Sequence, residues 1–135
     1  MTVRLLILEQ ALLDRASRPL ALHPAVRFAL DEFQTAPQMR TVSAVTEDIG
    51  LSPRRFIEVF RDQVGMTPKL FCRVRRFQRA VQSIAAGGKV EWTKVALESG
   101  YFDQAHFIHD FREFSGFTPT EYASRVFRHA NHVPL

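Results

Sequence analysis

The segment Phe-Ile-Glu-Val-Phe-Arg-Asp-Gln-Val-Gly-Met-Thr-Pro at residues 56–68 returns as Phe-Ile-His-Asp-Phe-Arg-Glu-Phe-Ser-Gly-Phe-Thr-Pro at residues 107–119. The two copies share Phe-Ile, Phe-Arg, Gly and Thr-Pro at the same spacing, seven identities in thirteen positions. So much identity within a chain of 135 residues indicates a structural unit used twice. Each copy follows a short helical pattern that ends at a glycine, Gly50 or Gly100, so each unit is predicted to be helix, turn, helix.

Apolar residues recur at helical spacing along almost the whole chain, and glycine, proline and capping residues separate the segments. Ser52-Pro53 is typical of an N-cap followed by a first helical position, and Thr118 to Glu121 has the spacing of a capping box. No segment has the alternation of a strand, so the predicted fold class is all-α. The expected helices lie near 4–16, from 24 onward, and near 43–49, 53–64, 68–86, 91–99, 103–114 and 119–128.

The second helix of each unit has one apolar and one polar face. Aromatic residues should hold the helix on its partner, which leaves the polar face outward, as a DNA-reading helix requires. Any amphipathic surface helix has this division, but two matched copies with glycine turns favour DNA reading. The expected core residues are Phe56, Val59, Phe60 and Val64 in the first copy, and Phe107, Phe111 and Phe114 in the second.

Positive charge is concentrated in one part of the chain. Residues 53–89 hold nine Lys or Arg against two acids, a net charge of +7. Residues 1–52 hold five basic and six acidic groups, and residues 90–135 hold four and six, so these parts carry −1 and −2. An ordinary solvated face would mix the signs, so the basic segment favours contact with nucleic acid.

The segment Gly-Tyr-Phe-Asp-Gln-Ala-His-Phe at residues 100–107 is followed by Phe111 and by Gly-Phe-Thr-Pro at 116–119. Together with Ile-Gly-Leu-Ser-Pro-Arg-Arg-Phe at 49–56, it makes residues 41–128 resemble the DNA-binding domain of the AraC/XylS family of bacterial transcription regulators. The resemblance covers about two thirds of the chain. It implies two helix-turn-helix subdomains, joined by a long helix, in successive major-groove segments on one face of double-stranded DNA.

The resemblance also implies a domain organisation. Members of the family usually carry a separate effector-sensing or dimerisation domain, for which residues 1–40 are too short. We expect these residues to be a helical extension, either the tail of such a domain in a fragment or part of a short member. If a partner domain was removed, the helix at 4–16 should have a free apolar face. The expected DNA-binding domain, 41–129, divides into a first helix-turn-helix at 41–66, a linker helix at 68–86, a second helix-turn-helix at 91–116 and a final helix at 119–128.

Transferred position by position, the resemblance implies DNA-contacting residues that lie on the polar faces chosen above. The base-contacting residues would be Arg54, Ile57, Glu58 and Arg61 in the first unit, and Ala105, His106 and His109 in the second. The residues contacting the DNA backbone would be Ser52, Arg55, Lys69, Arg73, Arg76, Gln104 and Arg112. We expect the first unit to contribute more to affinity and sequence choice, because it is the more basic of the two.

Individual residues on these faces have more than one interpretation. Arg54 is suited to a bidentate contact with guanine. Glu58 can accept from a cytosine amino group, or can hold Arg54 or Arg61 through a pair one helical turn apart. Ile57 and Ile108 can pack within the protein or touch a thymine methyl group, and packing is favoured for Ile108.

Other chemistry finds less support. His106 and His109 lie one turn apart with Asp110 beside them, a pattern that can bind a metal, but no third ligand follows at a fixed spacing. Cys72 is the single cysteine, which excludes an intramolecular disulfide and a cysteine-built zinc finger. A nucleophilic or methyl-accepting Cys72 is possible chemistry, but no histidine is paired with it, and a buried structural thiol is favoured. We expect no metal, no cofactor and no catalysis.

The remaining expectations concern partners. The longest apolar run, residues 5–8, is too short to span a bilayer, and no secretory signal is present, so a cytoplasmic protein is expected. The family resemblance allows RNA polymerase as a second partner and places effector binding outside this segment. The alternative function is a helical module that binds protein and not DNA. It accounts for the amphipathic helices but not for the basic segment.

Overall fold

The computed structural model describes residues 2–15, 21–35 and 42–130. These residues form eight helices and no strand, so the predicted all-α class is confirmed over the described ranges. The predicted helix boundaries agree with the structure to within two residues, because local capping signals mark most of them. The helices are α1 (Thr2–Arg15), α2 (Pro24–Thr35), α3 (Val42–Ile49), α4 (Pro53–Val64), α5 (Pro68–Ala85), α6 (Trp92–Ser99), α7 (Gln104–Ser115) and α8 (Pro119–Ala130).

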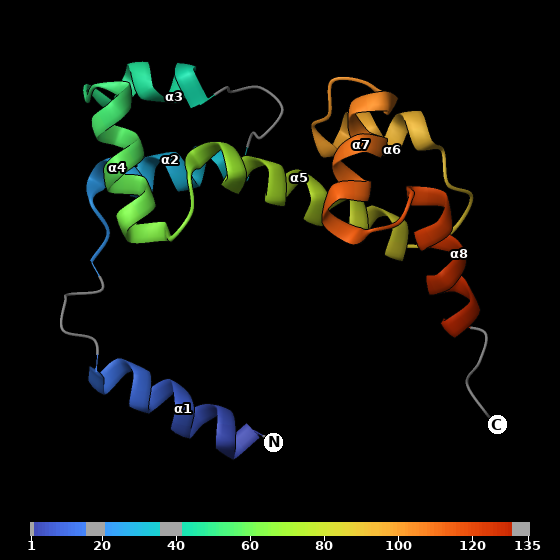
Figure 1. The fold of residues 1–135 in the computed structure, drawn as a ribbon, viewed down its shortest axis with the longest axis horizontal. Coiled ribbons are helices and arrows are strands. Elements are labelled where there is room, and N and C mark those ends of the chain that lie inside the picture. The colour runs from blue at the N-terminus through green and yellow to red at the C-terminus, as the bar shows by residue number, and fades with distance from the viewer. Residues whose placement is uncertain (1, 16–20, 36–41, 131–135) are drawn as a thin grey trace.

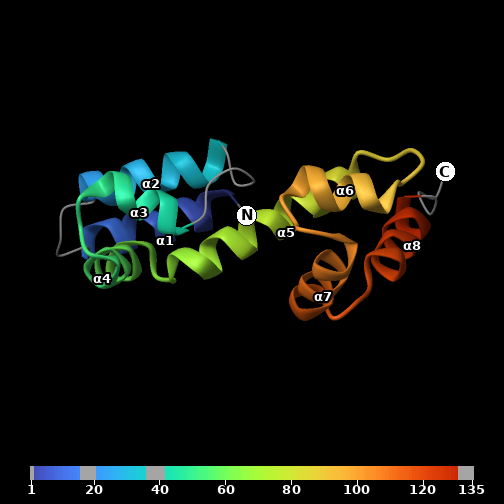
Figure 2. The same ribbon diagram turned by 90° about the horizontal axis from the view of Figure 1, so that it is seen from above.

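The long helix α5 joins two separate groups of helices (Figures 1 and 2). The first half of α5 packs with α2, α3 and α4, and we call this group the first unit. Its second half packs with α6, α7 and α8, the second unit. Each unit has its own buried apolar core, and the two cores have no residue in common. Thus α5 contributes different residues to each of the two cores.

Helix α2 is an integral part of the first unit. Val26, Ala29 and Phe33 are fully buried, and the Phe33 ring lies 6.1 Å from the Phe60 ring of α4, edge to face. The expected boundary between an extension at 1–40 and a DNA-binding domain from residue 41 therefore does not follow the packing. That boundary followed the extent of the family resemblance, which begins at residue 41; residues 36–41 lie outside the described ranges.

Helix α1 lies apart from both units (Figure 1). Its large apolar side chains Ile7, Leu8, Leu12 and Leu13 are all exposed. This helix therefore has an exposed apolar face, the feature expected if a partner domain had been removed. None of the described helices is long and apolar enough to cross a membrane.

Side-chain caps fix where the helices of each unit begin. Ser52 accepts a hydrogen bond at 3.2 Å from the backbone N–H three residues later, and Asp103 does the same at 2.7 Å. At α8 the Thr118 N–H donates to the Glu121 carboxylate at 2.9 Å, and the Glu121 N–H donates to the Thr118 hydroxyl at 3.2 Å. These bonds pair backbone donors that have no partner inside the helix, and they confirm the caps predicted at Ser52 and at Thr118 to Glu121.

Candidate nucleic-acid interface

Helices α4 and α7 are the second helices of the two helix-turn-helix units, and we call them the recognition helices. They lie apart along the length of the molecule, and both lie near the lower edge in Figure 2, the side that faces the viewer in Figure 1. Phe60 in α4 and Phe111 in α7 are fully buried, at equivalent positions of the repeat. The predicted division into inward aromatic and outward polar faces is confirmed by this burial.

The outer face of α4 presents Arg54, Arg55, Ile57, Glu58 and Arg61, all of them exposed. Glu58 lies between two arginines, with its carboxylate 3.4 Å from Arg54 Nε and 3.5 Å from Arg55 Nη1. The geometry thus favours the holding role of Glu58 over direct base contact. It gives Arg54 a preferred orientation without burying its guanidinium group.

The two histidines of α7 have different surroundings. His106 accepts a hydrogen bond at Nδ1 from the Phe102 N–H, 3.3 Å away, and its Nε2 lies 3.8 Å from Asp110 Oδ2. Both ring nitrogens of His106 therefore face protein atoms, and its side chain is 39% exposed. The side chain of His109 is 78% exposed. Of the two predicted base-contacting histidines, His109 is therefore the more exposed.

The remaining expected contacts of the second unit and of the turns are exposed. They are Ser52, Lys69, Gln104, Ala105 and Arg112. Ser52 also caps α4, and Gln104 accepts from the Thr93 hydroxyl of α6 at 3.2 Å. Ile57 and Ile108 are exposed to nearly the same extent. Their burial therefore gives no reason to assign a packing role to Ile108 and not to Ile57.

Arg73 and Arg76 were expected to contact the DNA backbone, but the structure gives them partners within the protein. Arg73 Nη2 donates to Asp110 Oδ1 at 3.0 Å and to Glu113 Oε2 at 2.7 Å, and Arg73 Nε lies 3.4 Å from Asp110 Oδ2. Arg76 Nη2 lies 3.9 Å from the same carboxylate. The two arginine side chains are only 23% and 17% exposed. The hydrogen bond from Arg73 to Asp110 is the largest cause of the raised pKa of Arg73.

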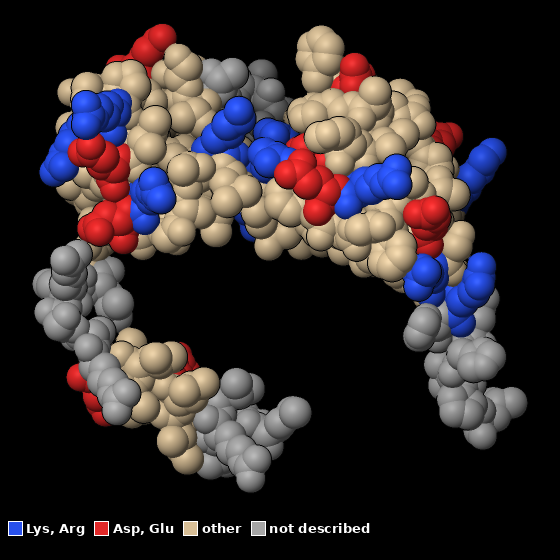
Figure 3. Space-filling view, viewed as in Figure 1, with Lys and Arg blue, Asp and Glu red and all other residues tan. Residues whose placement is uncertain are grey.

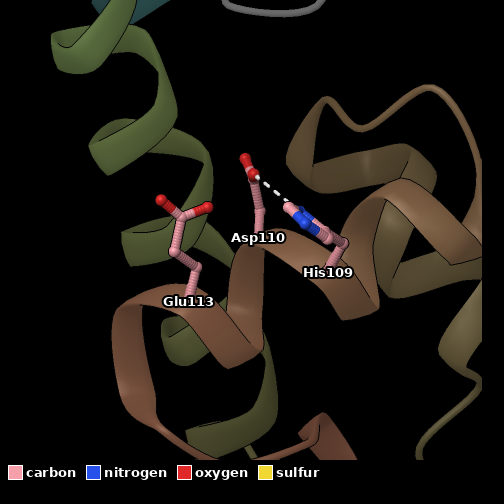
Figure 4. Close-up of side chains that lie close together, drawn as sticks. All are labelled: His109, Asp110 and Glu113. Atoms are coloured by element: carbon pink, nitrogen blue, oxygen red, sulfur yellow. Dashed lines mark ion pairs between the residues drawn. The ribbon is translucent and has the colours of Figure 1, made fainter.

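His109, Asp110 and Glu113 form the one cluster of possible metal ligands in the described part of the chain, with ligand atoms within 4.8 Å of one another. Figure 4 shows the three side chains extending from one stretch of α7, with the His109 ring beside the Asp110 carboxylate. The guanidinium group of Arg73 already binds both carboxylates. A cation of the protein therefore occupies the place that a metal would need, and the cluster does not fit a metal site.

Cys72 is buried, and burial raises its pKa to about 11. The thiol therefore stays protonated and unreactive at neutral pH. It packs in the first core with Phe33, Phe56 and Phe60. The environment of Cys72 agrees with the expected role of a buried structural thiol.

Phe102 is an exposed aromatic residue that the sequence interpretation overlooked. It lies in the turn before α7, and it is 87% exposed. In the first unit the turn is Gly50-Leu51-Ser52, with Leu51 packed on the core; in the second it is one residue longer. Tyr101 there takes the buried position, only 3% exposed, and Phe102 is the additional residue. Comparing the two turn lengths would have revealed it.

The charges on the side of the recognition helices are mixed. Figure 3 shows Lys and Arg over α4 and between the two units, with Asp and Glu beside them. Much of the +7 charge of residues 53–89 therefore has nearby acids. Part of that excess serves internal ion pairs, which the charge count alone does not distinguish.

Comparison with known proteins identifies relatives of this arrangement. Residues 45–125 match a protein family described as a helix-turn-helix domain. Over 85 residues the chain is 33% identical to the transcriptional regulator GadX of Escherichia coli, an alignment that covers 63% of this chain and 30% of GadX. The chain thus matches less than a third of the length of this curated relative.

Two solved structures have a similar fold. The C-terminal domain of AraT, a response regulator from Geobacillus stearothermophilus, gives a TM-score of 0.72 at 23% identity, covering 77% of this chain and 87% of that one. The DNA-binding domain of the global transcriptional factor AdpA, solved in complex with a target DNA, gives a TM-score of 0.70 at 18% identity. That alignment covers 81% of this chain and 97% of AdpA's domain.

Proposed function

The chain belongs to the AraC-type helix-turn-helix family, and from this we infer that it binds double-stranded DNA sequence-specifically to regulate transcription. One recognition helix enters each of two successive major-groove segments. The observation that carries this proposal is the placement of α4 and α7 toward the same side of the molecule. At 1.5 Å per residue, the 18 residues of α5 span about 27 Å, a suitable length for helices about one DNA turn, roughly 34 Å, apart.

Base contacts are proposed for the exposed side chains of the recognition helices. Arg54 is placed to donate two hydrogen bonds to a guanine, while Glu58 orients it from one helical turn away. His109 is the corresponding polar side chain of α7. The other residues proposed at base edges are Ile57, Arg61, Ala105 and His106, and those proposed at the DNA backbone are Ser52, Arg55, Lys69, Gln104 and Arg112.

Phe102 extends this interface. It precedes the N-cap residue of α7, so it lies at the end of the recognition helix that enters the groove, and its N–H holds the His106 ring. An exposed phenyl ring at that place fits an apolar contact with a thymine methyl group. We therefore add Phe102 to the proposed base contacts.

A protein-binding helical module is the second candidate function. The observation in its favour is the exposed apolar face of α1, which lies outside both units. A protein-binding role does not explain why the two recognition helices have the same sequence pattern and lie toward the same side of the molecule. A role in transcription adds three parts to the proposal. They are RNA polymerase as a second partner, effector binding outside this segment and a cytoplasmic location.

Binding measured against salt concentration separates the two candidates. Five exposed cations are proposed at the interface: Arg55, Lys69 and Arg112 at the DNA backbone, and Arg54 and Arg61 at base edges. With three phosphate contacts, the logarithm of the binding constant should fall with the logarithm of the salt concentration at a slope of about −3. A protein-binding module would show no binding to duplex DNA, or an affinity that salt leaves unchanged.

A further inference from the structure

The two units are connected by more than the continuity of α5. We propose that Arg73 and Arg79 are positioning residues that brace the units against each other and so fix the spacing of the two groove segments that the chain reads. The part of this inference that concerns DNA rests on the proposed function. The brace itself is a property of the free protein.

Arg73 carries the first connection, from the first unit to the second. Its neighbours Phe71 and Cys72 pack in the first core. Its guanidinium group, however, binds Asp110 and Glu113 of α7 and lies 5.1 Å from the centre of the Phe114 ring. The first half of α5 is thereby tied to the recognition helix of the second unit.

Asp110 makes this connection costly to break. Its side chain is 5% exposed, and besides Arg73 it faces Arg76 of α5 and the rings of His106 and His109. A buried carboxylate that loses its bidentate partner is left poorly solvated. Arg73 therefore favours the single orientation of α7 in which both oxygens of Asp110 are paired.

Arg79 carries the second connection, in the opposite direction. Its neighbour Ala80 is buried in the second core. Arg79 Nη2 nevertheless donates to the backbone oxygen of Gln34, 2.7 Å away, in the last turn of α2. Carbonyl groups in that turn have no partner within the helix and carry the negative end of the helix dipole, so a guanidinium group is a strong partner there.

The two arginines thus cross in opposite directions. Each unit packs on its own half of α5 and is also held by an arginine from the other half. The two cores share no residue, so apolar packing does not prevent one unit from rotating or bending against the other. Without the arginines, only the stiffness of α5 would limit this motion. The hydrogen bonds of the two arginines oppose this rotation and bending. Arg73 holds α7, and Arg79 holds α2.

The test begins with variants that keep the side-chain stem and remove the charge: Arg73→Met, Arg79→Met and the double variant. Arg75→Met is the matched control, since Arg75 lies on the same helix and donates to Gln78 of α5 itself. Binding is measured on the duplex selected by the wild-type chain, and on duplexes with one base pair added or removed between the two contacted blocks. The readout is the affinity for the selected duplex divided by the affinity for each duplex of altered spacing.

We expect the wild-type chain and Arg75→Met to bind the duplexes of altered spacing about a hundredfold more weakly than the selected duplex. In the double variant this ratio should fall to about tenfold. Loss of a phosphate contact would instead weaken all spacings equally and leave the ratio unchanged. An unchanged ratio in the double variant, with its helicity intact, overturns the role in spacing.

A second measurement does not depend on DNA. Spin labels on cysteines introduced at Ser43 and Ser124, exposed positions in the two units, report the distance between the units in a Cys72→Ala background. The distance distribution should be narrow in the wild-type chain and Arg75→Met, and broader in the double variant. Equal widths overturn the brace. A broader distribution in a chain that binds no DNA would leave the brace standing and reject the proposed function.

Discussion

His106, His109 and Arg112 occupy the outer side of α7, yet their contacts within the protein separate them. His106 accepts a hydrogen bond at Nδ1 and has its Nε2 near Asp110, whereas His109 is largely exposed and Arg112 is exposed. In α4, by comparison, Arg54 and Arg61 both extend outward, and Glu58 pairs with Arg54. The first recognition helix therefore offers two cations and the second mainly one imidazole at the positions expected to reach bases.

This difference predicts that the first recognition helix dominates sequence choice. Arg54→Ala should weaken binding by about 1–3 kcal/mol and relax the preference at one or two adjacent base pairs. His109→Ala should cost less, because an imidazole has fewer N–H donors than a guanidinium group and cannot donate two parallel hydrogen bonds to one guanine. Binding-site selection with each variant measures both effects. Greater loss of specificity in His109→Ala at neutral pH would reverse the assignment.

Phe102 has a separate prediction. Phe102→Ala should leave the stability of the fold nearly unchanged, because the side chain is exposed. It should weaken binding to the selected duplex while changing binding to unrelated duplexes little. Replacing thymine by uracil in the contacted block should reproduce the loss in the wild-type chain and add nothing in Phe102→Ala. An equal loss on every duplex would instead indicate a contact with the DNA backbone.

At the scale of the helices, the two recognition helices are held by matched aromatic groups. The Phe60 ring lies 5.7 Å from Phe56 and 5.8 Å from Phe71. The Phe111 ring lies 5.0 Å from Phe77 and 5.3 Å from Tyr122. Each recognition helix thus uses the same position of the repeat to pack on α5.

Phe60→Ala and Phe111→Ala should each lower the free energy of unfolding by about 3–5 kcal/mol, through lost burial and the cavity left behind. Denaturant unfolding followed by circular dichroism measures the loss. Ile57→Ala, in the same helix as Phe60 but partly exposed, is the control and should cost much less. Small losses at both phenylalanines would mean that the buried and exposed faces have been exchanged.

The helices and their faces were predictable because their signals are local. Ser52-Pro53, Asp103 and the Thr118 to Glu121 pair each act within a few residues, and each is a cap in the structure. The pairing of Arg73 with Asp110 spans 37 residues. Nothing local in the sequence marks an arginine that has such a distant partner, so the internal ion pairs of Arg73 could not be foreseen.

The place of α2 was not predictable for the same reason. Its amphipathic pattern marked a helix with a buried face, but not which core covers that face. The structure places Phe33 against Phe60 and brings the last turn of α2 to Arg79, which is 45 residues from Gln34. The exposed turn residue Phe102 was predictable in principle, from the unequal length of the two turns.

In the whole molecule, we propose that α5, Arg73 and Arg79 hold the two recognition helices at a fixed separation. The first unit contains α2, α3 and α4 with the first half of α5, and the second contains α6, α7 and α8 with the rest. Arg73 and Arg79 join each half of α5 to the opposite unit. A molecule built in this way should read two blocks of sequence at one spacing, and not one block or two at variable spacing.

Sequencing of random duplexes selected by this chain tests that claim most directly. The account predicts two preferred blocks whose centres lie about one helical turn, 10–10.5 base pairs, apart. Arg54→Ala should erase information in one block, and His109→Ala should erase less information, in the other. A single preferred block, two blocks without fixed spacing, or no enrichment of any sequence would contradict the account.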